Sequence, residues 1–142
     1  MFLPNPCRSE HHGAEQNAEF VQKTWRDLIG GQVEAALANM SDEVSWLIPG
    51  NVPNVSGLKR GKDEVRKFVS GIGQAFPQGL QTEIRKTHAA GDAVIVELTN
   101  RGKAFNGKDY ENEYCFVFEL EGGKIRRIRE YVDMHKVVQT LS

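Results

Sequence analysis

The spacing of apolar residues changes along the chain from a helical period to a strict alternation. Apolar side chains recur every three or four positions at Ala18, Val21, Trp25, Leu28 and Ile29, and two glycines follow. This period predicts an amphipathic helix that ends at the glycines. A shorter stripe over residues 33–40 and a longer one over 63–76 predict a second and a third helix.

Alternation dominates the rest of the chain. Val44, Trp46 and Ile48 share one face of the segment 43–49, which predicts a strand, and residues 50–61 form a long turn-rich connection. From residue 80 onward, glycine-containing turns separate four strand-like segments, 80–90, 93–105, 110–120 and 125–133. Short turns of this kind join neighbouring antiparallel strands, so these segments predict a meander.

Helices followed by strands are typical of the α+β class. We expect a curved antiparallel sheet wrapped around three N-terminal helices, with an internal pocket between the helices and the sheet. Residues 1–14 show no periodicity and are expected to be a flexible arm, whereas residues 15–142 are expected to form a single domain.

Composition and charge narrow the function classes. Of the 142 residues, 39% are apolar and 26% charged, with a formal net charge of −1, so nothing favours nucleic acid or an anionic membrane as a partner. No apolar run approaches the ~18 residues that span a bilayer. The two cysteines are far apart in the sequence, which argues against a disulfide framework and favours a soluble protein of the reducing cytoplasm.

Glu130 is the first candidate for chemistry. Alternation places this carboxylate on the same strand face as Ile128 and Val132, where ionisation is disfavoured unless a partner compensates. A carboxyl on an apolar wall has a raised pKa and suits general acid or base catalysis near neutral pH. The alternative is a buried carboxylate that closes an ion pair and has no catalytic role.

Arg101 is the candidate electrostatic partner of Glu130. It shares a strand face with Glu97 and Thr99. If that face is the inner one, Arg101 pairs with Glu130 or Glu97, and Glu97 and Thr99 line the pocket with it.

An aromatic face supplies the candidate pocket wall. Tyr110, Asn112, Tyr114 and Phe116 alternate on one face of the segment 110–120, so one amide lies among aromatic rings. This pattern suits a mostly apolar ligand site with a single polar anchor, and a plain aromatic core is the alternative. Trp25 and Trp46 are candidates for the same wall, with plain core packing again the alternative.

Other chemistries lack support in the sequence. The histidines include no pair at metal-ligand spacing, since His88 and His135 are single and His11 and His12 adjoin each other. No glycine-rich phosphate loop and no nucleophile elbow occurs. We therefore expect no metal and no cofactor.

The passages "WLIPGN…GLKRGKDEVRKFV" and "Y-x-N-x-Y…F-x-L-x-x-GKI…REY-x-D" resemble the SnoaL-like branch of the cystatin-like cone superfamily over about residues 15–138. That superfamily includes ketosteroid isomerases, limonene-epoxide hydrolases, polyketide cyclases and nuclear transport factor proteins. The resemblance implies a conical pocket roofed by helices and a homodimer formed through the outer surface of the sheet.

The resemblance also guides the assignment of residues. The positions of the ketosteroid isomerase residues align with Thr24 or Trp25, Ile48 and Phe116, so that set is missing. Of the epoxide hydrolase residues, Arg101 and Glu130 match in type, whereas Lys103, Trp46 and Ile48 occupy the other positions. In SnoaL-type cyclases the acid/base carboxylate lies on the last strand, close to Glu130.

These observations predict a cofactor-free enzyme or binder that acts on a small hydrophobic molecule. Glu130 is expected to be its acid/base, Arg101 its electrostatic partner and Asn112 an orienting hydrogen-bond donor. Isomerisation, cyclisation and hydration are the candidate reactions. The alternative is a non-catalytic ligand-binding or dimerisation module with the same fold.

Overall fold

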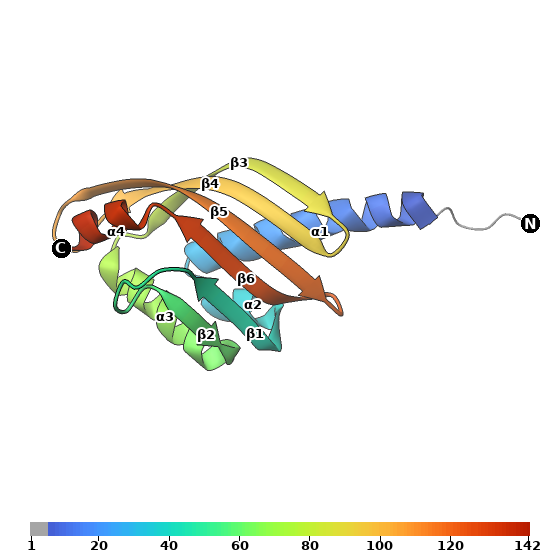
Figure 1. Cartoon of the computed structure of the whole chain (residues 1–142), viewed down its shortest axis with the longest axis horizontal. Coiled ribbons are helices and arrows are strands. Elements are labelled where there is room, and N and C mark those ends of the chain that lie inside the picture. Colours follow the sequence, from blue (N-terminus) through green and yellow to red (C-terminus); the bar gives the residue numbers. More distant parts are fainter. Residues whose placement is uncertain (1–5) are drawn as a thin grey trace, which may run out of the picture.

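The computed structural model describes the backbone of residues 6–142 and the side chains of residues 13–142. The chain forms helices α1 (Pro6–Ile29) and α2 (Val33–Ala38), strands β1 (Met40–Ile48) and β2 (Gly57–Arg60), and helix α3 (Gly61–Ala75). Strands β3 (Leu80–Ala90), β4 (Ala93–Lys103), β5 (Asp109–Glu121) and β6 (Lys124–Val132) follow, and helix α4 (Met134–Leu141) ends the chain. Figure 1 shows this α+β arrangement.

The six strands form one curved sheet in the order β2-β1-β6-β5-β4-β3. Strands β3 to β6 pair as the predicted antiparallel meander. The expected antiparallel pairing holds for every neighbouring pair of strands except β1 and β6, which pair in parallel. Side-chain alternation does not encode the direction of a partner that lies more than 80 residues away along the chain.

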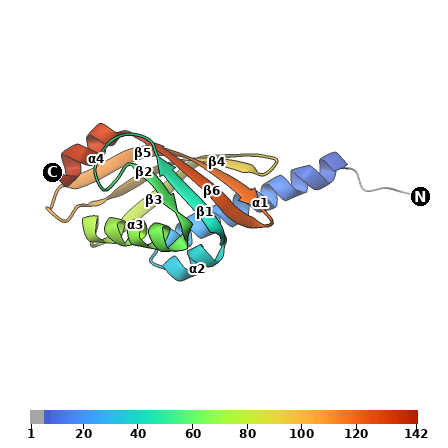
Figure 2. The ribbon, with the colours of Figure 1, turned by 60° about the horizontal axis from the view of Figure 1, so that its bottom comes forward.

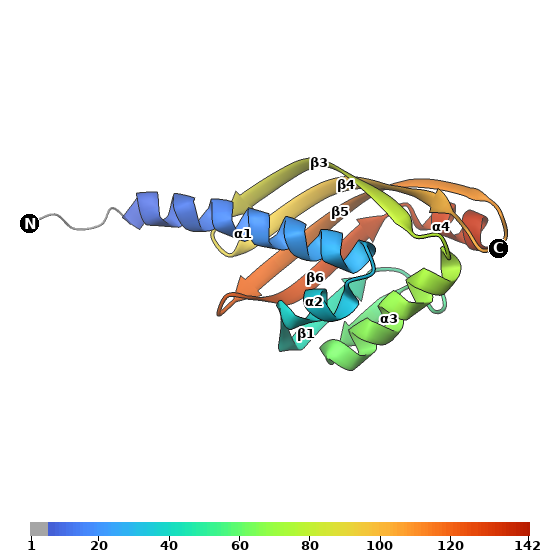
Figure 3. The same ribbon diagram turned by 180° about the vertical axis from the view of Figure 1, so that it is seen from behind.

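Helices α1, α2 and α3 lie against one side of the sheet, as the view from behind shows (Figure 3). Helix α1 runs along β3 and β4, and α3 packs beside β1 and β2 (Figure 2). The sheet bends around this helical layer, so one face of each strand is turned towards the helices and the other towards solvent.

The core lies between the helices and the inner face of the sheet. Each long strand contributes alternate residues to it, as β4 does with Val94, Val96 and Leu98, all at most 2% exposed. The buried aromatic residues Trp25, Trp46 and Phe116 meet at its centre. This alternation in β4 and β5 is the period of two on which the strand predictions rested.

Helix α4 covers the far end of the cone. Oδ1 of Asp133 accepts a hydrogen bond from the backbone N–H of Lys136 at 3.3 Å and so caps the helix N-terminus. Val137 then packs with Phe76 and Tyr110 in a second, smaller core.

Two element boundaries differ from the sequence-based prediction. Strand β2 lies within the segment 50–61, which was predicted to be a turn-rich connection, and it forms because its backbone pairs with β1. Helix α1 begins at Pro6, inside the segment 1–14 that was expected to be an arm. Residues 1–5 of that segment lie outside the described residues, and the domain boundary at residue 15 stays a prediction.

Candidate functional site

Glu130 lies on the inner face of β6, as its alternation with Ile128 predicted. Ile128 is 1% exposed and Glu130 is 7% exposed. Across the sheet, Glu130 stands opposite Phe116 of β5. On the other side of β6, the parallel register of β1 pairs Trp46 with Ile128, which brings β1 alongside the carboxyl.

Trp46 holds the Glu130 carboxyl directly. Its indole Nε1–H donates a hydrogen bond to Oε1 of Glu130 at 3.0 Å. The indole is itself fixed by neighbouring rings, with ring centroids 5.2 Å from Phe68 and 6.2 Å from Phe116. Trp46 is therefore both part of the core and a polar partner of the candidate acid/base.

The second carboxyl oxygen, Oε2, has a different environment. It makes no hydrogen bond to any residue that the structure describes, yet no buried side-chain oxygen or nitrogen among those residues lacks a partner. Oε2 must therefore account for part of the 7% of Glu130 that remains exposed, in space that water can reach. One oxygen is held by Trp46, and the other has no protein partner among the described residues.

Burial raises the pKa of Glu130 to about 7. The cause is the loss of hydration of the charged form, opposed by the hydrogen bond from Trp46 and by the positive charge of Lys59. A pKa in this range means that both the acid and the base form are populated near neutral pH, which is what proton transfer requires.

Lys59 is a site residue that the sequence analysis missed. It lies opposite Trp46 in the β1–β2 register, so it faces inward. Its ammonium group donates to the carbonyl oxygens of Val55 and Gly57 and lies 4.5 Å from the centroid of the Phe68 ring. Burial lowers the pKa of Lys59, and the nearby charge of Glu130 partly opposes this.

A signal for Lys59 existed in the sequence. The string "GLKRG" alternates, so a strand over 57–60 puts Leu58 and Arg60 on one face and Lys59 on the other. The glycines on either side made this stretch resemble a turn, and only the pairing with β1 identifies it as a strand.

The aromatic face of β5 lies inside the cone as predicted. Asn112 is 3% exposed and Phe116 is fully buried. Nδ2 of Asn112 donates to the Tyr110 hydroxyl at 2.9 Å and to the carbonyl oxygen of Asp133 at 3.0 Å. The hydroxyls of Tyr110 and Tyr114 are 2.5 Å apart.

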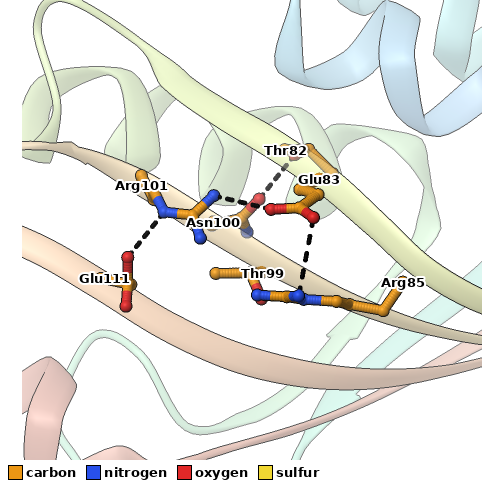
Figure 4. Close-up of polar contacts among 7 residues, drawn as sticks. All are labelled: Thr82, Glu83, Arg85, Thr99, Asn100, Arg101 and Glu111. Carbon is orange, nitrogen blue, oxygen red and sulfur yellow. Dashed lines mark hydrogen bonds and ion pairs between the residues drawn. The ribbon is translucent and has the colours of Figure 1, made fainter.

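This polar cluster continues into β4 and β3 through residues that were not predicted. Asn100 is 1% exposed and lies diagonally across from Tyr114 in the β4–β5 register, where its side chain acts to lower the pKa of that tyrosine. Its Oδ1 accepts a hydrogen bond from Thr82 at 2.5 Å (Figure 4). The Thr82 hydroxyl in turn accepts from the indole of Trp25 at 3.1 Å. Trp25 thus belongs to a hydrogen-bonded chain as well as to the core, where it lies 4.5 Å from Phe116 between ring centroids.

The surroundings of this cluster also raise the pKa values of the two tyrosine hydroxyls. Burial raises the pKa of Tyr114 well above its ordinary value, and the neighbouring Tyr110 and Glu130 add to this. Burial likewise raises the pKa of Tyr110. Both hydroxyls are therefore neutral at physiological pH, and each keeps its proton as a possible hydrogen-bond donor.

Arg101 does not contact Glu130, so the predicted pairing of these two residues is wrong. Its guanidinium binds Glu111 at 2.6 Å and Glu83 at 3.0 Å on the outer surface of the sheet (Figure 4). The inner face of β4 at this point is formed by Leu98 and Asn100, which places Arg101 on the opposite side.

Glu97 and Thr99 lie on the same outer face as Arg101, so they do not line the interior. Glu97 approaches His88 at 3.3 Å. Thr99 is 1% exposed, but it is covered from outside by Arg85, whose Nε donates to its hydroxyl at 3.0 Å. The alternation that groups 97, 99 and 101 was right, and the choice of inner face was wrong.

The sequence profile of the SnoaL-like domain family matches residues 21–128. The chain belongs to this family. No curated protein shows a significant match to this chain.

Solved structures share the SnoaL-like fold of this chain. Bal32a, from a soil-derived mobile gene cassette, is 22% identical with a TM-score of 0.82 and covers 91% of this chain and 98% of its own. A protein of Jannaschia sp. CCS1 assigned as a SnoaL-like polyketide cyclase is 18% identical, with a TM-score of 0.80, and covers 100% and 98%. TerC, crystallised with polyporic acid, is 19% identical, with a TM-score of 0.79, over 88% and 97%. At these identities the likeness shows the fold.

Two hollows on this SnoaL-like domain lie on its outside. One, of about 650 Å³, is lined by residues of β1, β2 and β6 with the start of α3, and the other, of about 330 Å³, lies at the β3–β4 turn and the facing ends of β5 and β6. Neither is lined by Glu130, Asn112 or Tyr114. An internal ligand cavity therefore stays a prediction.

No metal-binding group of three or more His, Cys, Asp or Glu side chains occurs among the residues that the structure describes. His11 and His12 lie outside the described side chains. None of the helices within residues 6–142 combines the length and the apolar character needed to cross a membrane.

Proposed function

We propose that this SnoaL-like protein binds a small hydrophobic molecule inside the cone and transfers a proton on it through Glu130. The single observation that carries the proposal is the state of the Glu130 carboxyl. It is buried, its pKa is raised to about 7, one oxygen is held by Trp46, and the other has no partner among the described residues. A carboxyl that serves only as a structural ion pair has its oxygens occupied and its pKa lowered.

The proposed step is proton transfer at a carbon next to a carbonyl group. The Glu130 carboxylate takes the proton, the C–H electron pair moves into the carbonyl, and an enolate forms beside a neutral Glu130. The carboxylic acid then returns the proton to the enolate at the same carbon or at a conjugated one. Isomerisation and cyclisation both begin with such an enolate, and no cofactor takes part.

Two groups suit stabilisation of the enolate. The Lys59 ammonium lies on the inner face near Glu130, and electrostatic attraction to an enolate oxygen is worth most at such partly buried positions. The neutral hydroxyls of Tyr110 and Tyr114 form a second polar group, which Asn112 orients. The surrounding rings of Trp46, Phe116 and Phe68 suit an apolar or aromatic substrate.

The similarity to other proteins supports the class of ligand. TerC was crystallised with polyporic acid, and the Jannaschia protein is assigned as a polyketide cyclase. Polyporic acid and polyketides are aromatic or carbonyl-rich small molecules. Such molecules suit a site that combines aromatic rings with the Glu130 carboxyl.

The test is proton exchange on a simple ketone. The protein is incubated with 2-tetralone in D₂O, and the loss of the α-proton signal is followed by ¹H NMR. We expect exchange above the buffer rate for the wild type, and loss of that excess in Glu130→Gln. Glu113→Gln, an exposed outer-face glutamate on β5, is the matched control and should exchange like the wild type. Equal exchange by the wild type and Glu130→Gln would contradict the assignment.

A non-catalytic binding module is the second candidate, favoured because Ile48 and Phe116 stand where ketosteroid isomerases have catalytic residues. Quenching of tryptophan fluorescence by 2-tetralone without any exchange in the wild type would favour it. Trp25 and Trp46 are the two tryptophans of the chain and both lie in the cone, so their emission reports on this interior.

We also propose that the protein is a homodimer formed through the outer face of the sheet. Ile95 and Tyr131 are 36% and 45% exposed on that face, where a second copy would cover them. Sedimentation at micromolar concentration is expected to show a dimer that Ile95→Glu weakens. Val138→Glu, at an equally exposed apolar position on α4, is the control, and a monomeric wild type would refute the proposal. A cytoplasmic location stays an expectation.

A further inference from the structure

A hollow rich in arginine lies on the outside of the domain, away from the cone interior. Its volume is about 650 Å³, within the range of sites that hold small organic molecules. It is lined by Asp42, Glu43, Ser45, Leu47, Leu58, Arg60, Gly61, Arg126, Arg127 and Arg129. We call it the arginine hollow. It is independent of the acid/base proposal, because no residue of that site lines it. It lies on the same outer face of the sheet as the proposed dimer contact, since Arg129 is the register neighbour of Val117, which itself pairs with Ile95, so sedimentation is measured alongside binding.

The strand register explains why the arginines converge there. Ser45 of β1 stands between Arg60 of β2 on one side and Arg127 of β6 on the other. The next outward position of β1, Leu47, stands beside Arg129. Because neighbouring strands are ~4.8 Å apart and same-face residues of a strand are ~6.6 Å apart, these three long side chains can meet over β1.

The carboxylates of the hollow do not neutralise these arginines. Asp42 is engaged by Lys62 at 3.4 Å, and Glu43 by Arg126 at 3.5 Å. Arg127 reaches away to Glu119 at 3.1 Å.

The guanidinium groups of Arg60 and Arg129 have no hydrogen bond or ion pair with any residue that the structure describes. Positive charges held close together repel each other unless an anion lies between them. The arginine hollow therefore carries uncompensated positive charge in a chain whose net charge is −1.

The floor of the hollow is apolar. Leu47 and Leu58 stand side by side in the β1–β2 register, and Leu58 is 42% exposed. The hydroxyl of Ser45 has no partner among the described residues and can donate to an anion. The combination of guanidinium groups, a hydroxyl and leucine side chains suits a ligand with an anionic head and a short apolar body.

We propose that the arginine hollow binds a small organic anion, a carboxylate or phosphate ester that carries an apolar chain. The anionic head accepts hydrogen bonds from Arg60 and Arg129, and the chain covers Leu47 and Leu58. Arginine is well suited to this role because its planar fork binds two oxygens of one carboxylate or phosphate at once.

Calorimetric titration with defined probes tests the proposal. The probes are octanoate and octyl phosphate, which share the chain and differ in the head, and octanol, which lacks the charge. The protein variant is Arg60→Gln/Arg129→Gln, in which the backbone N–H of residue 60 keeps its bond to Glu64. The control is Arg26→Gln, because Arg26 is an exposed arginine of α1 whose side chain has no partner among the described residues.

We expect one or both anions to bind the wild type and Arg26→Gln alike, and the double variant about tenfold more weakly. Octanol should not distinguish the three proteins. Which anion binds more tightly identifies the head group. Glu130→Gln should leave the affinity for the anion unchanged, so failure of the acid/base proposal leaves this one intact.

Three results would overturn the proposal. The first is no anion binding by the wild type, and the second is equal affinity in the wild type and the double variant. The third is a change in the sedimentation of the ligand-free double variant, with the affinity for octanoate and octyl phosphate unchanged. That last result would mean that a second copy of the chain, and not a small anion, occupies the arginine hollow.

Discussion

The indole Nε1–H of Trp46 donates a hydrogen bond to Oε1 of Glu130 at 3.0 Å. The two residues are 84 positions apart and meet because β1 and β6 pair in parallel at the centre of the sheet. The bond favours the charged form of the carboxyl, while burial disfavours it. The balance leaves the pKa of Glu130 at about 7, where a carboxyl can give and take a proton.

Glu130→Gln should change how stability depends on pH. The pKa of Glu130 is about 7 in the folded protein against an ordinary 4.5, so the folded state holds a proton that the unfolded state releases. The resulting stability is complete below pH 4.5 and is lost as pH rises to 7, by about 3 kcal/mol. Glutamine does not titrate, so between pH 5 and pH 8 the unfolding free energy of the variant should gain about 2.5 kcal/mol relative to the wild type, as measured by urea unfolding.

Glu113→Gln is the control for this measurement, because Glu113 is exposed. It should follow the wild-type dependence of the unfolding free energy on pH. The same dependence in Glu130→Gln as in the wild type would contradict a raised pKa at Glu130.

Trp46→Phe should be more destabilising at pH 8 than at pH 5. At pH 5 Glu130 is protonated and the variant loses packing and a hydrogen bond between neutral groups. At pH 8 the buried carboxylate loses its donor, which adds up to about 1.4 kcal/mol, the free energy at which a carboxyl with a pKa of about 7 takes up a proton instead. Urea unfolding at both pH values measures the difference.

Trp25→Phe provides the comparison for Trp46→Phe. Trp25 is also buried and also loses an indole hydrogen bond, in this case to Thr82. The loss of unfolding free energy in Trp25→Phe should be independent of pH, because Trp25 makes no hydrogen bond to Glu130. An equal pH dependence in both variants would assign the effect to packing and not to the carboxyl.

Lys59→Met should raise the pKa of Glu130 above the wild-type value. The charge of Lys59 lowers the pKa of this carboxyl, and methionine keeps an apolar side chain against the Phe68 ring without the charge. Carboxyl-labelled NMR measures the change. Lys62→Met removes a lysine three residues away that pairs with Asp42, and it should leave the titration of Glu130 where it is.

Arg101→Gln should not move the pKa of Glu130. Arg101 binds Glu83 and Glu111 on the outer face, and the sheet separates it from the carboxyl. The hydrogen bond from Arg101 lowers the pKa of Glu83, and the same contacts raise the pKa of Arg101. The pKa of Glu83 should therefore rise in the variant. A shift at Glu130 comparable to that of Lys59→Met would mean that Arg101 does reach the interior.

Alternation alone was sufficient to group residues on strand faces. It placed Glu130 with Ile128, and Asn112 with Tyr110 and Phe116, because side chains of a strand point to opposite sides in turn. The order of helices and strands likewise followed from the change of period, and with it the α+β class.

Alternation was not sufficient to say which face of β4 is the inner one. Beyond Leu98 the apolar series ends, and both Asn100 and Arg101 are polar. Asn100 is inside because Thr82 of β3 donates to its amide oxygen and Tyr114 of β5 lies diagonally across from it. Those partners are distant in sequence, so local pattern could not distinguish a buried amide from a buried guanidinium. Lys59 was missed for a similar reason, since β2 is a strand only through its pairing with β1.

The titration of Glu130 is the most direct test of the account. Carboxyl-labelled NMR on the wild type, with Glu130→Gln to assign the signal, gives the pKa without reference to any substrate. We predict a pKa near 7 that moves when 2-tetralone is added. A pKa at or below the ordinary value of 4.5, unchanged by 2-tetralone, would show a structural carboxylate and contradict the proposed acid/base role.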